Sequence, residues 1–402
     1  MELILDVFNF VLVAIMIGVS GAWVFLIKSM LITFRDTPFL DKFEKKDHSN
    51  PKVSVILPAR NEENFIGKCL DSLLDQDYEN YEIIAVDDSS EDSTGTIIEK
   101  YAKKNSKIIH VSAKPKPQGW IGKNWACIEG YRKATGELLL CTDSDTKHSK
   151  KIMSLAVAHL LSFNLDALTV IPKMLCLDNW TKITLPVIST FLHTRFSAIR
   201  VNDPSKKTGY FFGSFFIIKR KVYEAVGTHE GVKQELIEDG ALGMKVKESG
   251  YKLKMVRGEH LVDAVWARNW DTLWNAIKRL MIPFFLQNRR IAVGVFFAVL
   301  FLLLMPFPIL IYSGLFFHLG NSFELLFFIS AIASTLVYFA SVADATKALQ
   351  IKTIHALLVP IGSFIVVSGF LAGIVQANGK TAVTWRGRKY CMKEQVQNSI
   401  SV

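Results

Sequence analysis

The sequence VSVILPARNE, at residues 53–62, decides the fold class. Its first half is a nearly continuous apolar run, the pattern of a strand buried on both faces of a sheet. A polar turn follows, with Asn61 as a candidate N-cap, and then a segment with one apolar face that starts near Glu62. We therefore expect a strand over residues 52–59 and a helix directly after it.

The same alternation continues along the next 80 or so residues. Further buried strands are predicted over 82–86, 108–111 and 138–141, with helices from about Ser89 and over 123–133. Strands that alternate with helices predict an α/β fold, a mainly parallel sheet covered by helices. Because ligands of such sheets bind at the carboxyl ends of the strands, the functional site is expected at that edge.

Four long apolar stretches explain why 50% of the 402 residues are hydrophobic. They cover residues 7–27, 291–317, 325–343 and 353–379, and apart from His355 they contain no ionisable Lys, Arg, His, Asp or Glu. A helix needs about 20 apolar residues to cross a bilayer core, so each stretch is long enough to span. The segment before the first stretch is acidic and lacks an obvious cleavage motif, which favours an uncleaved anchor over a signal peptide.

The chain is therefore expected to have five parts. They are an N-terminal transmembrane anchor (1–34), a globular α/β domain (51–262), an interfacial amphipathic helix (263–290), C-terminal transmembrane helices (291–379) and a basic tail (380–402). In the third part, Trp266, Trp270 and Trp274 recur at helical spacing among basic residues, as in helices that lie in the membrane interface. A helix packed under the globular domain is the alternative.

Lys and Arg crowd residues 28–52 and are absent before residue 7. The positive-inside rule then predicts a multi-pass protein of the cell membrane with its globular domain in the cytosol. The basic tail conflicts with four full spans, which would put it outside; Pro306, Pro308 and Pro360 are compatible with a broken or re-entrant span. We assign the net charge of +10 to contacts with anionic lipids and expect no nucleic acid partner.

Two acidic clusters follow predicted strands. Asp87 and Asp88 end the second strand, and Asp143 and Asp145 end the fourth. Two carboxylates at positions i and i+2 can turn into one crevice, and hard oxygen ligands with open positions suit Mg²⁺ or Mn²⁺ that bridges phosphate oxygens. The alternative is a pair of structural turns, since Asp is common in loops.

Two more motifs carry charged groups. Glu238 and Asp239 precede Gly240 and could supply a base that takes a proton from an acceptor, or they could be first-turn acids of a helix. Lys123 opens a predicted helix, where its charge and the free N–H groups favour a phosphate. A solvated surface lysine is the other reading.

Two further features, an aromatic segment and a histidine, each allow two interpretations. Residues 210–216 are dense in aromatic side chains around Gly213, and they either wall an acceptor pocket or form a core strand. His260 follows Glu259 and either approaches a metal or is structural.

These motifs together resemble glycosyltransferase family 2 over about residues 51–260. The resemblance rests on the opening at 53–62 and on the spacing of Asp87-Asp88, Asp143-x-Asp145 and Glu238-Asp239. It implies a GT-A type domain in which Asp88 contacts the nucleotide base, Asp143 the ribose or metal and Asp145 the metal, with Asp239 as catalytic base beside Glu238. The donor site would comprise Pro58, Arg60, Glu62, Asp87, Asp88, Lys123 and Asp143.

Two other stretches resemble a membrane branch of that family. GWIGKNWA (119–126) and TWRGRKY (384–390) look like the hopanoid-associated and diaponeurosporenoate glycosyltransferases, and more distantly ceramide glucosyltransferase, which implies a lipid acceptor. The Gln-x-x-Arg-Trp motif of many membrane relatives is incomplete, since 274–280 reads WNAIKRL. Gly213, Trp274 and Arg279 remain candidate acceptor or phosphate contacts.

The expected function is transfer of a single sugar from a nucleotide-diphosphate sugar, a UDP-sugar by first choice, to a lipid at the cytosolic membrane face. A divalent metal, Mg or Mn, is the expected cofactor, and the family resemblance implies an inverting reaction. Alternatives are a polyprenyl-phosphate sugar synthase, a processive polysaccharide synthase, which the incomplete motif disfavours, and a membrane protein that binds nucleotide sugar without turnover.

Overall fold

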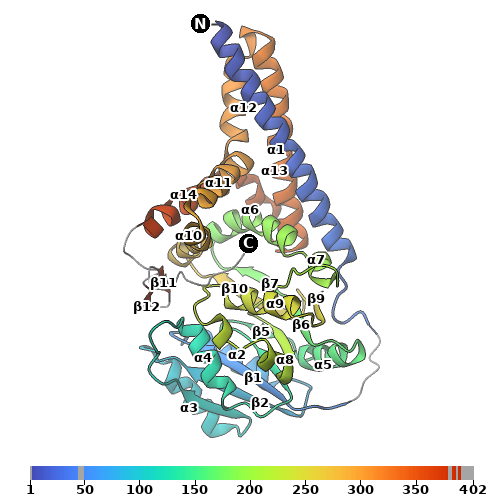
Figure 1. The fold of residues 1–402 in the computed structure, drawn as a ribbon, viewed down its shortest axis with the longest axis vertical. Coiled ribbons are helices and arrows are strands. Elements are labelled where there is room, and N and C mark those ends of the chain that lie inside the picture. The colour runs from blue at the N-terminus through green and yellow to red at the C-terminus, as the bar shows by residue number, and fades with distance from the viewer. Residues whose placement is uncertain (1, 44–48, 379–382, 386–387, 391–402) are drawn as a thin grey trace. The chain divides into compact units, whose positions relative to one another are not determined.

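The computed structural model describes residues 2–43, 49–378, 383–385 and 388–390 (Figure 1). The chain divides into two compact units, each described by itself. One is helical and contains 1–35, 176–197 and 266–383, and the other is α/β and contains 36–175, 198–265 and 384–402. Residues 176–197, which fall within the expected globular range 51–262, thus cluster with the helices.

The α/β unit is built on a seven-stranded sheet in the order β3-β2-β1-β4-β8-β6-β9. Its strands are β1 (Val53–Ala59), β2 (Tyr81–Asp87), β3 (Ile108–Ser112), β4 (Leu138–Cys141), β6 (Ala167–Ile171), β8 (Phe216–Lys219) and β9 (Leu253–Arg257). The pairs β1–β2, β1–β4, β2–β3 and β6–β9 are parallel, and only β8 runs against its two neighbours. The predicted fold class, a mainly parallel α/β sheet of GT-A type with apolar helices, is confirmed.

Helices and short strands complete this unit. The helices are α2 (Ile66–Leu74), α3 (Thr94–Lys104), α4 (Gly122–Tyr131), α5 (Ile152–Ser162), α7 (Ala198–Asn202), α8 (Arg220–Ala225) and α9 (Glu238–Glu248), with a 3-10 turn η1 (Glu230–Val232). A second sheet has the order β5-β10-β7 with bounds Lys147–His148, Val262–Ala267 and Lys173–Cys176, and β11 (Val383–Trp385) pairs with β12 (Arg388–Tyr390).

Strand β1 lies at the centre of this core. Val55 and Leu57 pack into the core on one face of the sheet together with Leu70 of α2. Ile56 points into the core on the other face, against Cys127 of α4. An apolar run without alternation is thus explained by burial on both faces.

Helices α2 and α3 of the α/β unit begin later than the sequence predicts. The helix after β1 starts at Ile66 instead of Glu62, and Asn61 takes a left-handed backbone with φ of 54° instead of capping it. The helix after β2 starts at Thr94 instead of Ser89, which is also left-handed at φ 55°. The intervening residues form loops at the strand ends, where the Glu62 N–H donates to Thr94 Oγ1.

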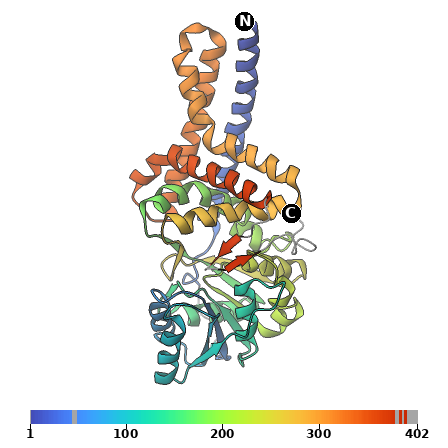
Figure 2. The same ribbon diagram turned by 90° about the vertical axis from the view of Figure 1, so that its left-hand side faces the viewer.

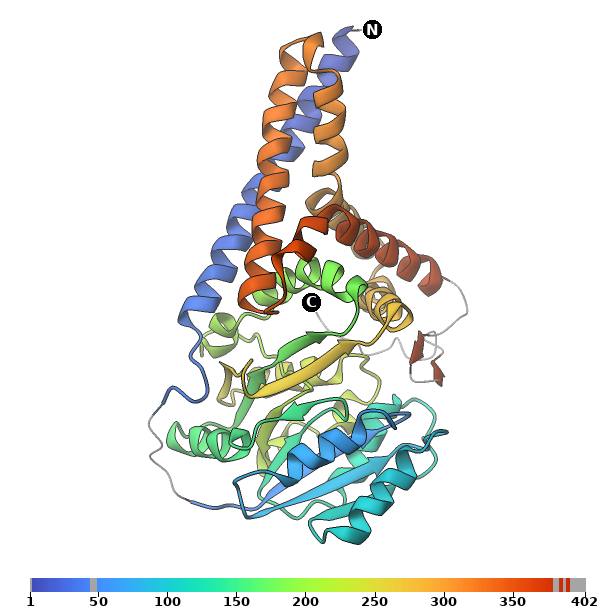
Figure 3. The ribbon, with the colours of Figure 1, turned by 180° about the vertical axis from the view of Figure 1, so that it is seen from behind.

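The helical unit contains two groups of helices. In all three ribbon views α1 (Glu2–Asp36), α12 (Pro306–Leu315) and α13 (Asn321–Lys347) run alongside one another, whereas α6 (Asn179–Arg195), α10 (Trp270–Gln287) and α14 (Val359–Asn378) lie across them (Figures 2 and 3). The remaining segments are α11 (Arg289–Val299), a π-helical turn η2 (Leu300–Leu304), and 3-10 turns η3 (Phe317–Leu319) and η4 (Thr353–Leu358).

Polar contacts join α1 to its neighbours in the helical unit. Trp23 Nε1 of α1 donates to the Leu302 carbonyl at 2.8 Å, and Asn9 Nδ2 donates to Ser322 Oγ of α13 at 3.2 Å. Tyr312 of α12 donates to Asn9 Oδ1 at 3.3 Å. Such bonds fix the register of helices whose other contacts are apolar and non-directional.

Within the described residues, three helices are long and apolar enough to cross a membrane: Leu3–Asp36, Asn321–Lys347 and Thr353–Ala377. The predicted stretch 291–317 is instead a pair of helices, Arg289–Leu304 and Pro306–Leu315, bent by 55°. The bend falls at Pro306, which has no N–H to continue the helical hydrogen bonds. These helices support the expected association with a membrane.

Helix α14 packs closely against α6 and α10 through glycines. A Cβ added at Gly362 would lie 2.5 Å from the Ile183 carbonyl oxygen of α6, and one at Gly373 would lie 2.5 Å from that of Lys278 in α10. Apolar side chains of α14 at other positions are exposed, among them Phe364 at 60%. The helix therefore presents one face to its neighbours and an apolar face to its surroundings.

We expect Gly373→Ala to lower the stability of the helical unit. Alanine in a helix is ordinarily better than glycine by about 1 kcal/mol, but here its methyl would collide with backbone that cannot rotate away, and overpacking costs about 1–3 kcal/mol. The apparent Tm of the detergent-solubilised protein should fall by several degrees. Gly294→Ala in α11, where nothing lies within 4 Å, is the control and should leave the Tm equal or higher. An equal Tm for both variants would contradict the close approach.

Candidate active site

The carboxyl ends of β1, β2 and β4 bring the predicted acidic clusters to one edge of the sheet. Ala59 pairs with Asp87 in the parallel register, and the Asp88 N–H donates to the Ala59 carbonyl at 2.9 Å. On the other side of β1, Ile56 pairs with Cys141, two residues before Asp143. The edge predicted to hold the site therefore carries both clusters.

Lys123 connects two of the acidic motifs. Its Nζ lies 2.6 Å from Asp143 Oδ1 and 2.6 Å from Glu238 Oε1, and its side chain is only 18% exposed. Burial alone would lower the pKa of Lys123, but the carboxylates of Asp143, Glu238 and Asp239 raise that pKa well above its usual value. Lys123 is not the solvated lysine of the alternative reading; it ties α4, β4 and α9 together.

Asp239 lies in the first turn of α9 and faces the same site. Its Oδ2 accepts a hydrogen bond from the Gly213 N–H at 2.8 Å, and its Oδ1 accepts one from its neighbour Gly240 at 2.8 Å. Burial and the negative charge of Glu238 raise the pKa of Asp239 to about 7, although Lys123 opposes the shift. Glu238 and Asp239 are thus acidic residues of a helix first turn, which is one of the two interpretations of the sequence. They also belong to the cluster of charged groups around Lys123.

Gly213 is where the acids and Lys123 meet. A Cβ there would lie 2.7 Å from Asp239 Oδ2, 3.1 Å from Asp143 Oδ2 and 3.1 Å from Lys123 Nζ. The aromatic neighbours Phe211 and Phe215 are fully buried in the core. The segment 210–216 is therefore largely core, while its glycine keeps a small space open at the acids.

Asp143 and Asp145 are both partly exposed at the end of β4. Within the described residues, no group of three or more His, Cys, Asp or Glu side chains is placed to hold a metal ion. The carboxylates fit a divalent cation only if a ligand supplies further oxygens, as a diphosphate would. His260 points elsewhere, since its Nε2 lies 3.1 Å from Asp41 Oδ2.

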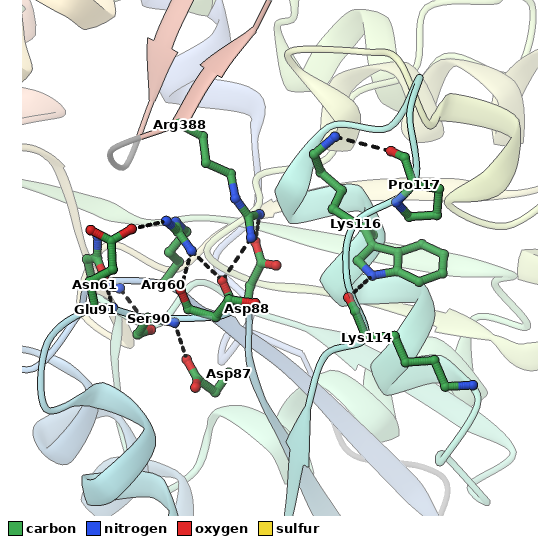
Figure 4. A network of polar contacts seen from close by, with 12 residues as sticks. Arg60, Asn61, Asp87, Asp88, Ser90, Glu91, Lys114, Lys116, Pro117 and Arg388 are labelled. Atoms are coloured by element: carbon green, nitrogen blue, oxygen red, sulfur yellow. Dashed lines mark hydrogen bonds and ion pairs between the residues drawn. The ribbon is translucent and has the colours of Figure 1, made fainter.

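A second polar cluster surrounds Asp88 (Figure 4). Arg60 Nη1 donates to the Asp88 carbonyl at 2.7 Å and also to the Ser89 carbonyl, and Arg60 Nη2 lies 2.8 Å from Glu91 Oε1. Arg60, predicted to bind the donor, therefore braces the loop after β2. The carboxylate of Asp88 pairs instead with Arg388 of β12.

The other predicted donor residues are structural to different degrees. Pro58 lies inside β1 opposite Val86, and Glu62 is buried in the loop after β1. Asp87 Oδ1 accepts a hydrogen bond from the Ser90 N–H at 3.0 Å and so caps the turn after β2. None of these three side chains belongs to the cluster around Gly213 as far as the described contacts go.

Trp274 and Arg279 lie on α10 in the helical unit. Trp274 stacks on Trp270 with ring centroids 5.6 Å apart, and Trp270 meets Trp180 of α6 edge to face at 5.2 Å. Trp180 and Trp270 are 46% and 38% exposed. Sequence reasoning missed Trp180 as a member of this group, because it lies 90 residues away from Trp270.

The mainly parallel sheet, with acidic residues at the ends of β2 and β4, has the GT-A type of fold. Residues 54–227 match the model for glycosyl transferase family 2. This match and the names of similar proteins confirm the predicted resemblance to family 2 and the prediction of a transferase enzyme.

Curated relatives agree with this assignment. The chain is 27% identical over 252 residues to the probable glycosyltransferase YdaM of Bacillus subtilis, which covers 59% of this chain and 58% of that protein. It is 34% identical over 111 residues to the 4,4'-diaponeurosporenoate glycosyltransferase of Staphylococcus haemolyticus, covering 27% of this chain and 28% of that protein. The chain therefore spans less than two thirds of the length of both relatives, of which the second belongs to the predicted membrane branch.

A solved structure has the same fold. The mannosyltransferase PcManGT from Pyrobaculum calidifontis, in complex with GDP-Man and Mn²⁺, matches with a TM-score of 0.52 at 17% identity. The match covers 91% of this chain and 99% of that chain.

We expect Gly213→Ala to lower turnover of a nucleotide sugar by about a hundredfold. A methyl group at this position must displace the carboxylate of Asp239 or the ammonium of Lys123. A misplacement of about 1 Å can reduce the rate by that factor. The measurement is the rate of nucleotide release by the purified protein. Gly67→Ala on α2, with its nearest neighbour 3.6 Å away, is the matched control and should leave the rate unchanged. Full activity of Gly213→Ala would rule out a reacting centre at this glycine.

Proposed function

We propose that the protein transfers one sugar from a nucleotide-diphosphate sugar to the hydroxyl group of a membrane lipid, with inversion at the anomeric carbon. One observation carries the proposal: the buried carboxylate of Asp239, held by the Gly213 N–H, lies beside the ion pairs of Lys123 at the strand-end edge. A family 2 domain with a carboxylate in this place has the group that an acceptor hydroxyl needs.

The reaction needs one proton transfer in a single displacement. Asp239 takes the proton of the acceptor hydroxyl while that oxygen bonds to the anomeric carbon. The bond from the anomeric carbon to the phosphate oxygen breaks, and the nucleoside diphosphate leaves. A base with a pKa raised to about 7 is strong enough to accept the proton and is mostly ionised above neutral pH.

Lys123 and Glu238 support this base. The ammonium of Lys123 offsets the repulsion between the acids, and its bonds to Asp143 and Glu238 fix their orientation. We assign the diphosphate to the same edge, next to Asp143 and Asp145. A divalent cation held by those two carboxylates would neutralise charge on the leaving diphosphate.

The donor is proposed to be a UDP-sugar whose base contacts Asp88. The fold relative PcManGT was solved with GDP-Man and Mn²⁺, which supports a nucleotide-sugar donor and a divalent metal and keeps a GDP-sugar as the second choice. The name of the 4,4'-diaponeurosporenoate glycosyltransferase supports a lipid acceptor. The exposed tryptophans of α6 and α10 are of the kind that lie at a membrane interface, where they would meet such a lipid.

The helices of the helical unit support a topology with three spans. We propose that α1, the bent pair α11–α12, and α13 cross the membrane, and that α14 lies in the interface with its exposed apolar face toward lipid. Helix α14 packs along α6 and α10 through Gly362 and Gly373 and lies across α13 (Figure 3). With three spans the basic tail ends on the cytosolic side, which removes the conflict with the positive-inside rule.

This topology predicts the side of the C-terminus. An epitope tag fused there should be accessible to antibody in inverted vesicles and protected in right-side-out ones. A second tag inserted at Gly320, in the turn before α13, should give the opposite pattern and serves as the control. Both tags on the outer side would mean that α14 spans the membrane.

Substitution of Asp239 separates the proposed lipid hydroxyl from a phosphate acceptor. We expect Asp239→Asn to lower lipid-stimulated nucleotide release by at least about a hundredfold, since a positioned general base contributes 10²–10⁴ in rate. The wild-type rate should fall as the pH drops through about 7, where Asp239 becomes protonated. The assay uses a panel of UDP- and GDP-sugars with Mg²⁺ or Mn²⁺ and total membrane lipid.

Glu248→Gln on the exposed end of the same helix is the matched control and should keep full activity. Release that survives Asp239→Asn would favour a polyprenyl-phosphate acceptor, whose oxygen is already ionised. Binding of a nucleotide sugar with no release under any donor or lipid would favour the non-catalytic alternative.

A further inference from the structure

The carboxylate of Asp88 is buried and has a cationic partner far away in sequence. Its side chain is 4% exposed, and Arg388 of the C-terminal hairpin pairs with its Oδ2 (Figure 4). Arg388 Nη2 also donates to the Asp88 carbonyl at 3.2 Å. Arg60 bonds only the carbonyl of Asp88 and not its carboxylate. Among the described residues, Arg388 is therefore the side chain that fixes this carboxylate.

The second carboxylate oxygen makes no such bond. Asp88 Oδ1 is buried and accepts no hydrogen bond from the part of the chain that the structure describes. A buried carboxylate oxygen without a donor is costly, because the group has lost its water and gained nothing in return. An oxygen of this kind at the strand-end edge is suited to accept an N–H of a ligand.

We propose that Arg388 is a positioning residue of the donor site, which holds Asp88 so that its free oxygen accepts an N–H from the nucleobase. The inference rests on the proposed function, and it makes the C-terminal hairpin part of nucleotide recognition. The bonds from Arg388 to both the carboxylate and the carbonyl leave the Asp88 side chain little rotational freedom. Burial raises the pKa of Asp88, and the charge of Arg388 opposes that rise.

Two other roles for Arg388 make different predictions. If Arg388 bound the diphosphate itself, its loss would weaken nucleoside diphosphates more than monophosphates. If Arg388 occupied the place of the nucleotide, its loss would strengthen binding. A positioning role acts through the base, so the number of phosphates does not change its effect.

The test is a binding titration of the full-length, detergent-solubilised protein with UMP, UDP, GMP and GDP. We expect Arg388→Gln to weaken the monophosphate and the diphosphate of the preferred base by the same factor, about tenfold, since a hydrogen bond to a charged group is lost. Arg388→Lys keeps the charge but not the two-point contact and should recover part of the loss. Lys103→Gln removes the charge of an exposed i,i+4 pair on α3 and should change neither affinity.

A double-mutant cycle with Asp88→Asn adds a readout that loss of stability would not give. In the Asp88→Asn background, Arg388→Gln should weaken binding no further, because the residue that it positions is already impaired. Unchanged affinity, a loss confined to the diphosphate, or additive losses would each overturn the positioning role. Wild-type protein that binds neither UDP nor GDP would instead overturn the proposed function, and this inference with it.

Discussion

The ammonium of Lys123 lies 2.6 Å from each of two carboxylates, Asp143 and Glu238, in a site that is largely shielded from water. Without this cation the acids of β4 and α9 would be buried together at close range, and their mutual repulsion and lost hydration would drive them apart. Asp239 adds a third carboxylate, whose pKa is raised by burial and by the charge of Glu238. The proposed catalytic arrangement therefore depends on one lysine that comes from a third element, the first turn of α4.

The loops after β1 and β2 replace the first turns of the helices that the sequence predicts there. Asn61 and Ser89 take left-handed backbone conformations, and α2 and α3 begin only at Ile66 and Thr94. Sequence reasoning predicted β1, β2, β3 and β4 well, because an apolar run buried on both faces leaves a strong signal. It placed both helix starts too early, because Asn61 and Ser89 are ordinary capping residues when judged locally. Their actual conformations follow from bonds between two loops, such as that from Glu62 to Thr94, which no local pattern encodes.

Hydropathy likewise identified the apolar helices but not their arrangement. The stretch 353–379 is as apolar as a span, yet glycines at 362, 369 and 373 bring its helix within close reach of α6 and α10. An all-round apolar sequence cannot distinguish a helix in lipid from one packed across others, since both surroundings are apolar. The distinguishing information lies in which small residues meet which neighbours. Residues 176–197 show the same limit, because their clustering with distant helices is a property of packing and not of the local sequence.

The contact between Asp88 and Arg388 joins positions 300 residues apart, so the sequence of residues 384–390 alone does not indicate it. A resemblance at these residues can be seen in the sequence, whereas their role depends on which residues they contact in the fold. Asp88 could be expected at the strand-end edge from β2 alone, but a buried carboxylate also needs a partner. Arg60, which follows β1, bonds the carbonyl of Asp88. The partner therefore had to come from elsewhere in the chain. Arg388 of β12 supplies it.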